Sequence, residues 1–209
     1  MKTLLIPALL ATWIAGSSMP AHASVMVQLS TNQMVDASDS IVRGKILEVW
    51  TEEDERGVVW TRAQLEVTQV LKGDKSRKKY IIDQMGGTFG GNQSIVQGRT
   101  HFSTGEEGIF FLEDLKSGRT ITVGLNQGKF TLRLDPYSRQ TIVQRFSPPH
   151  GKTYDHRFIP LPSKAEEIVT LDDLVDSIET RLTTGWDGKE IPGTSLERLT
   201  RINGLEVTR

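Results

Sequence analysis

The sequence predicts a mainly β protein, a small barrel followed by a C-terminal amphipathic helix. Apolar and polar residues alternate from Val59 to Thr68, the pattern of a strand with one buried and one exposed face. Val70 and Leu71 then break this alternation, which indicates a bulge or the end of the strand, and closed barrels use such bulges to turn corners. Apolar residues recur at helical spacing from Leu171 to Leu182, which places the amphipathic helix after the strands.

The N-terminal segment is typical of an export signal. A lysine is followed by an apolar run from Leu4 to Ala15 and then by Ala21-His22-Ala23, which forms an A-x-A cleavage site. We expect removal of residues 1–23 and a mature chain that begins at Ser24. A transmembrane anchor would need about 20 apolar residues, whereas this run is shorter and contains Pro7. The sequence therefore predicts a periplasmic or secreted protein without a membrane span after cleavage.

Composition excludes several classes of protein. The chain contains no cysteine, which excludes disulfides, thiolate zinc sites, thiol nucleophiles and a lipid anchor on cysteine. The formal net charge is −1 with both signs mixed along the sequence, so there is no electrostatic footprint for nucleic acid. One basic cluster follows the clearest strand and is interpreted as a solvated hairpin end, with a binding patch as the alternative: Lys72, Lys75, Arg77, Lys78 and Lys79.

The barrel domain is expected over residues 24–147, with a short helix near its start that Ser30 or Thr31 can cap. An acidic turn at Glu52–Gly57 joins the strand Ile41–Thr51 to the strand described above, so the two are predicted to form a hairpin. Further strand-like runs follow, most of them divided by turns that contain glycine: Tyr80–Met85, Glu107–Glu113, Thr120–Leu125, Lys129–Leu134 and Arg139–Phe146.

A long glycine-rich segment lies between Met85 and Glu106. Loops of this length are uncommon and are often functional. A phosphate cradle is one interpretation, but no Gly-Lys-Ser/Thr follows, so a flexible loop whose glycines adopt positive φ is favoured. The segment still carries an aromatic and several polar side chains that are candidates for contact with a partner: Phe89, Asn92, Gln97, Arg99 and His101.

The C-terminal third changes in composition. Residues 148–169 contain several prolines and are predicted to be an extended connector. Thr170 and Asp173 resemble a capping box at the start of a docking helix over residues 170–184. The tail, residues 185–209, is predicted to be weakly helical or disordered.

Four short motifs resemble those of a known superfamily: Asp36–Ile46, Leu65–Gly73, Phe102–Glu106 followed by Phe110–Leu112, and Gly128-Lys129-Phe130. This pattern is similar to that of the netrin-like and tissue-inhibitor-of-metalloproteinase (TIMP-like) superfamily, in particular its cysteine-free bacterial exported proteins of unknown function. The resemblance implies a five-stranded barrel of the oligonucleotide/oligosaccharide-binding (OB) type. Animal TIMPs inhibit through an N-terminal cysteine, which this chain lacks, so inhibition by that route is not implied.

Motifs for catalysis are scarce, and no catalytic residue, metal ligand or cofactor is assigned. The sequence has no HExxH and no Gly-x-Ser-x-Gly elbow. His150 and His156 lie in a proline-bounded segment at a spacing that is not a recognised ligand spacing. Trp50 and Trp60, near the two ends of the first hairpin, are either packing residues at the barrel edge or a surface on which a sugar stacks.

The leading hypothesis is an exported, non-catalytic binding module that engages a protein partner in the envelope or outside the cell. One alternative is a protein that binds a glycan or small molecule at the two tryptophans. A second alternative is an exported metal-dependent hydrolase that uses His101, or His150 with His156. Enzyme activity is disfavoured because its motifs are missing.

Overall fold

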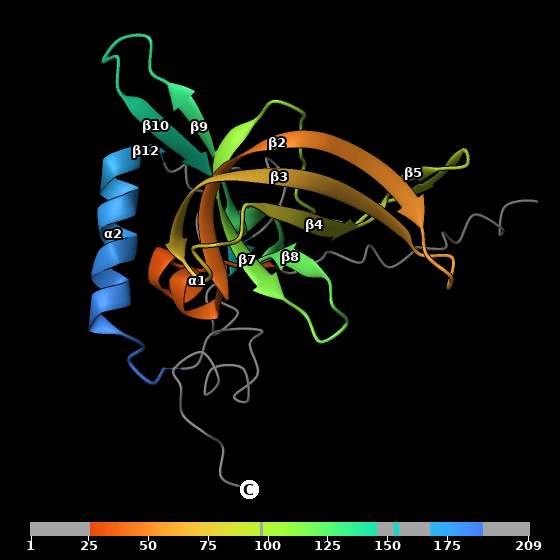
Figure 1. The fold of residues 1–209 in the computed structure, drawn as a ribbon, viewed down its shortest axis with the longest axis horizontal. Coiled ribbons are helices and arrows are strands. Elements are labelled where there is room, and N and C mark those ends of the chain that lie inside the picture. The colour runs from red at the N-terminus through yellow and green to blue at the C-terminus, as the bar shows by residue number, and fades with distance from the viewer. Residues whose placement is uncertain (1–25, 97, 146–152, 155–167, 190–209) are drawn as a thin grey trace, which may run out of the picture.

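The structure is a computed structural model that describes residues 26–96, 98–145, 153–154 and 168–189. Figure 1 shows strands through most of this part of the chain and two α-helices beside them, so the prediction of a mainly β protein is confirmed. None of the helices in these ranges is long and apolar enough to cross a membrane. The expected export signal, Gln97, His150 and His156 lie outside the described residues.

One large sheet organises the molecule, with neighbouring strands in the order β12-β10-β9-β7-β2-β3-β4-β8. Its strands are β2 (Ser40–Glu53), β3 (Val59–Lys72), β4 (Lys79–Met85), β7 (Glu107–Asp114), β8 (Thr120–Thr122), β9 (Lys129–Leu134), β10 (Thr141–Arg145) and β12 (Ile168–Thr170). Two small sheets accompany it, formed by β1 (Met26–Val27) with β11 (Thr153–Tyr154) and by β5 (Gly87–Phe89) with β6 (Asn92–Ser94).

The sheet branches at β7. One edge of β7 pairs with β2, and the other edge pairs first with β9 and then with β8. Strand β8 also meets β4 in parallel through the pair Ile82 and Thr120, so pairing runs from β2 through β3, β4, β8 and β7 back to β2. The result is not a clean barrel, because that closure rests on one residue pair and β9, β10 and β12 extend away from the circuit.

The long hairpin of β2 and β3 is bent by irregular pairing. Ile41 faces Lys72 while the next residue, Val42, faces Val70, which leaves Leu71 as an extra residue in β3. The bulge predicted from Val70 and Leu71 is therefore confirmed, and β3 continues past it. Such bulges bend a strand and increase its local twist, which suits a sheet that curves back on itself in Figure 1.

Two apolar cores lie on the two sides of β7. Its central residues, Ile109-Phe110-Phe111-Leu112, are all buried, with Ile109 and Phe111 in one core and Phe110 and Leu112 in the other. The second core also contains Val42, Ile46, Ala63, Leu65, Tyr80 and Ile82, so it fills the interior of the five-strand circuit. The first core lies between the sheet and the helices. A strand buried on both faces has to be apolar throughout, which explains the uninterrupted run in β7.

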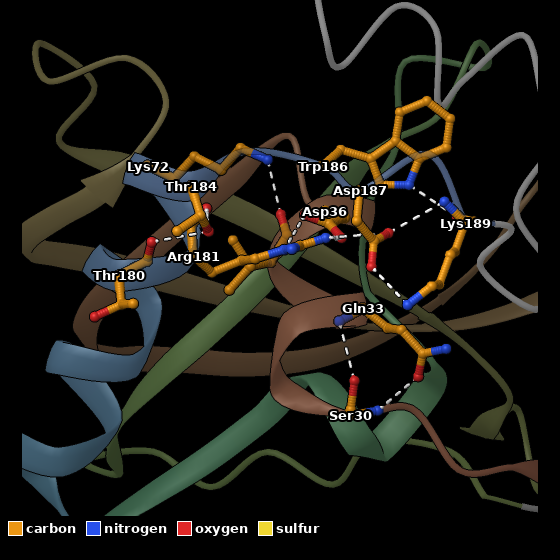
Figure 2. Close-up of polar contacts among 11 residues, drawn as sticks. Ser30, Gln33, Asp36, Lys72, Thr180, Arg181, Thr184, Trp186, Asp187 and Lys189 are labelled. Atoms are coloured by element: carbon orange, nitrogen blue, oxygen red, sulfur yellow. Dashed lines mark hydrogen bonds and ion pairs between the residues drawn. The ribbon is translucent and has the colours of Figure 1, made fainter.

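Helix α1 (Thr31–Ala37) begins with a capping box. The Ser30 hydroxyl accepts a hydrogen bond from the backbone of Gln33, and the Gln33 side chain accepts one from the backbone of Ser30. At the other end, the Lys72 ammonium donates to the carbonyls of Val35 and Ser38, where the helix dipole favours a cation. Figure 2 shows the capping box of Ser30 and Gln33, and the Lys72 side chain at the other end of the helix.

Helix α2 (Leu171–Thr184) is held against α1 by a buried ion pair (Figure 2). Arg181 donates from Nε and Nη2 to both carboxylate oxygens of Asp36, at 2.9, 3.2 and 2.5 Å. The helix starts where Thr170 accepts a hydrogen bond from the backbone of Asp173, and it ends at Gly185, whose φ is +71°. Leu174 and Ile178 are buried in the first core, so apolar packing and the ion pair together fix α2.

Two segments differ from their predicted form. The strand predicted over Thr120–Leu125 ends at Thr122, because Gly124 and Leu125 have φ of +62° and +61° and lead into the 3-10 helix η1 (Leu125–Gly128). Within the range predicted as a connector, Thr153–Tyr154 and Ile168–Thr170 pair as short strands with β1 and β10.

Candidate functional site

The glycine-rich segment after β4 contains a small hairpin. Strands β5 and β6 pair with each other through Phe89 opposite Asn92 at the tip and Gly87 opposite Ser94 at the base. Gly87 is required there, since its φ is +149° and a Cβ atom would lie 2.7 Å from the Thr61 hydroxyl. The base is fixed to the main sheet, where the Thr51 hydroxyl donates to the Thr88 carbonyl at 2.8 Å. The expected loop is therefore partly ordered by strand pairing.

The second half of the segment is pinned to the core of the sheet. The backbone of Thr100 donates to the Gln84 side chain at 3.1 Å, and its hydroxyl lies 2.7 Å from that of Thr122 in a buried contact. The backbone of Asn126 donates to the Gly98 carbonyl at 3.1 Å, which ties the segment to η1. Both ends are thus held by rigid elements, and the residues between them are presented at the surface.

Two of the motifs behind the family resemblance are joined by buried contacts of Lys129 beneath this segment. The Lys129 ammonium, in a side chain that is 9% exposed, donates to the His101 carbonyl and to Glu106 Oε1 at 2.6 Å. Gly128 lets η1 pack closely on the backbone of Val123, because a Cβ there would lie 2.5 Å from the Val123 carbonyl oxygen. Phe130 is buried in the first core. The Gly-Lys-Phe element therefore has a structural role, which is to hold the segment in place.

A hollow of about 280 Å³ opens between the segment and η1. Its described lining residues are Gln93, Ile95, Val96, Gly98, Arg99, His101 and Asn126. Two of the predicted partner-contact residues, Arg99 and His101, are brought together here. Phe89 and Asn92 lie on the hairpin instead and do not line the hollow, and Gln97 lies outside the described residues.

Asn126 is the residue in this wall that the sequence did not reveal. The residue is 2% exposed, both atoms of its amide are closed to solvent, and neither has a hydrogen-bond partner among the described residues. Buried polar groups are nearly always hydrogen-bonded, so such a group calls for an explanation. The sequence pattern placed Asn126 in a turn after a strand and gave no sign that it would be buried, because the left-handed φ of Leu125 is what turns the chain inward.

The described lining of the hollow carries the positive charge of Arg99 without a carboxylate to balance it. The described lining contains no Asp or Glu, and no ion pair forms on Arg99 within the described part of the chain. Burial, followed by the positive charges of Arg99 and Lys129, lowers the pKa of His101 below its ordinary value of 6.5. His101 is therefore neutral at neutral pH, and Arg99 provides the positive charge of the wall.

The tryptophans proposed as a stacking surface lie elsewhere, on the outer face of the β2 and β3 hairpin. Trp50 donates to Glu52 at 3.2 Å, and Trp60 donates to Asp54 at 2.9 Å. The Arg119 guanidinium lies over the Trp60 ring, 4.0 Å from its centre. One face of that ring is thus occupied, and a sugar could stack on it only after Arg119 moved away.

Trp60 borders one of two adjoining hollows that share Arg62, Ser117 and Arg119. Four ion pairs link residues of these hollows. Asp83 lies 2.9 Å from Arg62 and 3.1 Å from Arg119, Glu52 lies 3.0 Å from Arg62, and Asp54 lies 3.6 Å from Arg119. This network fastens the turn between β7 and β8 to the sheet. Its arginines already have carboxylate partners, in contrast to Arg99 in the other hollow.

Within the described residues, no group of three His, Cys, Asp or Glu side chains is placed to hold a metal ion. His101 lies near cations rather than carboxylates, and His150 and His156 lie outside the described ranges. In comparisons with known proteins, no protein-family model and no curated protein matches the sequence.

Proposed function

We propose that this protein is an exported binding module that engages a protein partner, in the envelope or outside the cell, through the segment after β4. The single observation that carries the proposal is the hollow beside η1, whose described lining combines Arg99, without a carboxylate to pair with, and the exposed side chain of Ile95. Export itself is proposed from the N-terminal sequence alone.

The surroundings of the hollow suit contact with a protein. The side chains of Ile95 and Phe89 are 75% and 40% exposed, and burying such large apolar groups favours association. Arg99 adds a cation, and arginine is enriched at protein interfaces. The segment is held at both ends by the sheet and η1, so little ordering would be needed on binding.

For the scaffold, we propose an OB-type barrel, as the family resemblance implies. The circuit of β2, β3, β4, β8 and β7 encloses its own apolar core, and its closure through one residue pair suits a partly open five-stranded barrel. Strands β9, β10 and β12 and the two helices would then be additions on one side of that barrel. Because folds of this kind host unrelated functions, the binding proposal rests on the hollow and not on the fold.

The test is partner capture by the immobilised protein from the envelope and secreted fractions of the producing cell. One variant changes Phe89, Arg99 and His101 together to Ala, Gln and Ala, and the matched control is Arg133→Gln on exposed β9. We expect a partner to be retained by the unmodified protein and the control and lost by the triple variant. Equal retention by all three would remove the segment as the binding site.

A further inference from the structure

Of the two adjoining hollows that share Arg119, the one beside β4 and the turn between β7 and β8 has a volume of about 490 Å³. We name it the cationic hollow, because four cationic side chains and one carboxylate line it: Arg62, Arg77, Lys79, Arg119 and Asp83. None of its lining residues belongs to the hollow beside η1. An inference about the cationic hollow therefore goes beyond the proposed function and does not rest on it.

Two of these cations come from the basic cluster for which the sequence left a solvated hairpin end and a binding patch as alternatives. Arg77 and Lys79 line the cationic hollow, whereas Lys75 and Lys78 do not. Lys72 donates to carbonyls at the end of α1 instead. The fold thus separates the basic cluster into cations on a concave surface and cations outside it.

The guanidinium of Arg77 is already held in position in this structure. It lies over the ring of Tyr80, 3.8 Å from the ring centre, and its Nε donates to the Lys79 carbonyl at 3.3 Å. Asp114 lies 3.8 Å from Nη1, which is too far for a hydrogen bond. The Nη groups of Arg77 therefore remain able to donate to a ligand.

The other cations also keep donors for a ligand. Arg119 donates from Nη1 to Asp83 at 3.1 Å, while Asp54 lies 3.6 Å from Nη2, beyond hydrogen-bond distance. A guanidinium has five N–H donors, so these ion pairs leave most of the donors of Arg119 unused. Lys79 is exposed, and its ammonium forms no ion pair within the described part of the chain.

The lining of the cationic hollow has an excess of positive charge. Asp83 is its one carboxylate, and the other carboxylates that pair with its arginines do not line it: Glu52, Asp54 and Asp114. Clefts lined by one sign of charge attract ligands of the opposite sign. The cationic hollow is therefore suited to an anion.

The spread of the donors over several elements indicates which anion. A carboxylate has two oxygens and is saturated by one bidentate arginine, whereas a phosphate monoester has three terminal oxygens and a charge of about −2 at neutral pH. Donors from the start of β4 and from the turn between β7 and β8 can engage separate phosphate oxygens.

The volume indicates the size of the ligand. About 490 Å³ lies within the range of small-ligand sites, and the side chain of Ile81, which is 38% exposed, lines the cationic hollow and can pack on an organic group. We propose that the cationic hollow binds a phosphorylated small molecule, whose phosphate is held by Arg77, Lys79 and Arg119.

The experiment is an NMR titration of the isotope-labelled protein with inorganic phosphate, glucose 6-phosphate and glucose at constant ionic strength, monitored at the backbone amides of Tyr80 and Gly118. Arg77→Gln and Lys79→Gln each remove one cation of the cationic hollow. The exposed Lys79 makes no side-chain contact that the fold needs, so Lys79→Gln keeps the test valid if Arg77→Gln is unstable. The matched control is Lys75→Gln, which removes one cation of the same basic cluster outside the cationic hollow.

We expect saturable shifts with both phosphate ligands and none with glucose. Affinity should fall about tenfold in Arg77→Gln and in Lys79→Gln, because each loses a charged hydrogen bond to phosphate. It should change by less than about twofold in Lys75→Gln, since salt screens a distant exposed charge. The tighter of the two phosphate ligands decides between a phosphate ester and free phosphate.

Two results would overturn the inference. The first is the absence of saturable shifts with either phosphate ligand at about 10 mM. The second is an equal loss of affinity in Lys75→Gln and Lys79→Gln, which would show that the basic cluster attracts phosphate by its net charge and not through the cationic hollow. Neither result bears on partner capture through the segment after β4.

Discussion

At the scale of single residues, the two surface regions differ in how their charges are balanced. Asp83 pairs with both Arg62 and Arg119, whereas the described lining of the hollow beside η1 has no carboxylate for Arg99. An arginine without a carboxylate partner at the surface can pair with a carboxylate of another protein. This contrast is why the binding site is placed at Arg99.

His101 gives a prediction that depends on pH. Its pKa is lowered chiefly by burial and then by the positive charges of Arg99 and Lys129. We expect the imidazole signals in an NMR titration to have a midpoint below 6.5, and Arg99→Gln to move the midpoint upward because one positive charge is removed. A lowered folded pKa also means that stability falls as the pH drops below 6.5. A midpoint at or above 6.5 in the unmodified protein would contradict this environment.

The ion pair between Arg181 and Asp36 gives a prediction for stability. Arg181→Leu would leave a 7%-exposed Asp36 without its partner, and breaking a buried pair typically costs about 3–5 kcal/mol. Urea denaturation would measure the change. Lys189→Ala removes a cation that is 84% exposed and should change the free energy of unfolding by less than about 0.5 kcal/mol. Equal effects of the two changes would show that α2 is not held by the buried pair.

At the scale of elements, the segment after β4 depends on a few supports from neighbouring strands. Its hairpin base needs glycine at position 87. Its second half needs the ion pair of Lys129 with Glu106 and the hydrogen bond of Lys129 with the His101 carbonyl. These contacts also explain why Lys129 is buried in β9, because its ammonium pairs with Glu106 and donates to the His101 carbonyl. The elements of the sheet thus serve as a frame for the candidate site.

Lys129→Met tests these contacts of Lys129. The variant keeps the length of the side chain but removes the cation, so Glu106 loses its ion pair and the tie to His101 is lost. We expect faster hydrogen exchange at the backbone amides of Thr100 and Ile46, which bond to Gln84 and Glu106. Unchanged protection from hydrogen exchange at both amides would show that the segment is held without the contacts of Lys129.

Gly87→Ala tests the hairpin base, with Gly90→Ala as the matched control. Both glycines have positive φ, but a Cβ at Gly87 would lie 2.7 Å from the Thr61 hydroxyl, whereas nothing lies within 4 Å of one at Gly90. Alanine at Gly90 should cost about 1–2 kcal/mol from the backbone alone, and alanine at Gly87 should cost more, as measured by thermal or urea unfolding. A smaller cost at Gly87 would contradict the close packing of β5 on β3.

The sequence predicted elements well where local patterns decide them. The alternation in β3, its bulge at Leu71, and the helices that begin after Ser30 and Thr170 all follow from neighbouring residues. The predicted end of β8 was wrong because Leu125 has a left-handed φ, and leucine rarely adopts that conformation. Asn126 could not be found from the sequence, since its burial arises only when η1 packs on Gly98.

At the scale of the whole molecule, two apolar cores share strand β7. One fills the circuit of five strands, and the other joins the sheet to α1 and α2, as Figure 1 shows from the positions of those helices. The candidate site is formed by the segment after β4 and η1, and none of its described lining residues takes part in the ion pair that joins the helices. Changes at the site should therefore leave the cooperative unfolding of the whole protein intact, which makes stability and binding separable.

The most direct test of the central claim is Arg99→Gln, measured for partner capture and for stability beside Arg133→Gln. If the hollow beside η1 is the binding site, the partner should be lost from Arg99→Gln and retained by Arg133→Gln, while the free energy of unfolding changes by less than about 0.5 kcal/mol in both variants. Retention of the partner by both variants would contradict the account, because the cation of the hollow would then make no contact with the partner.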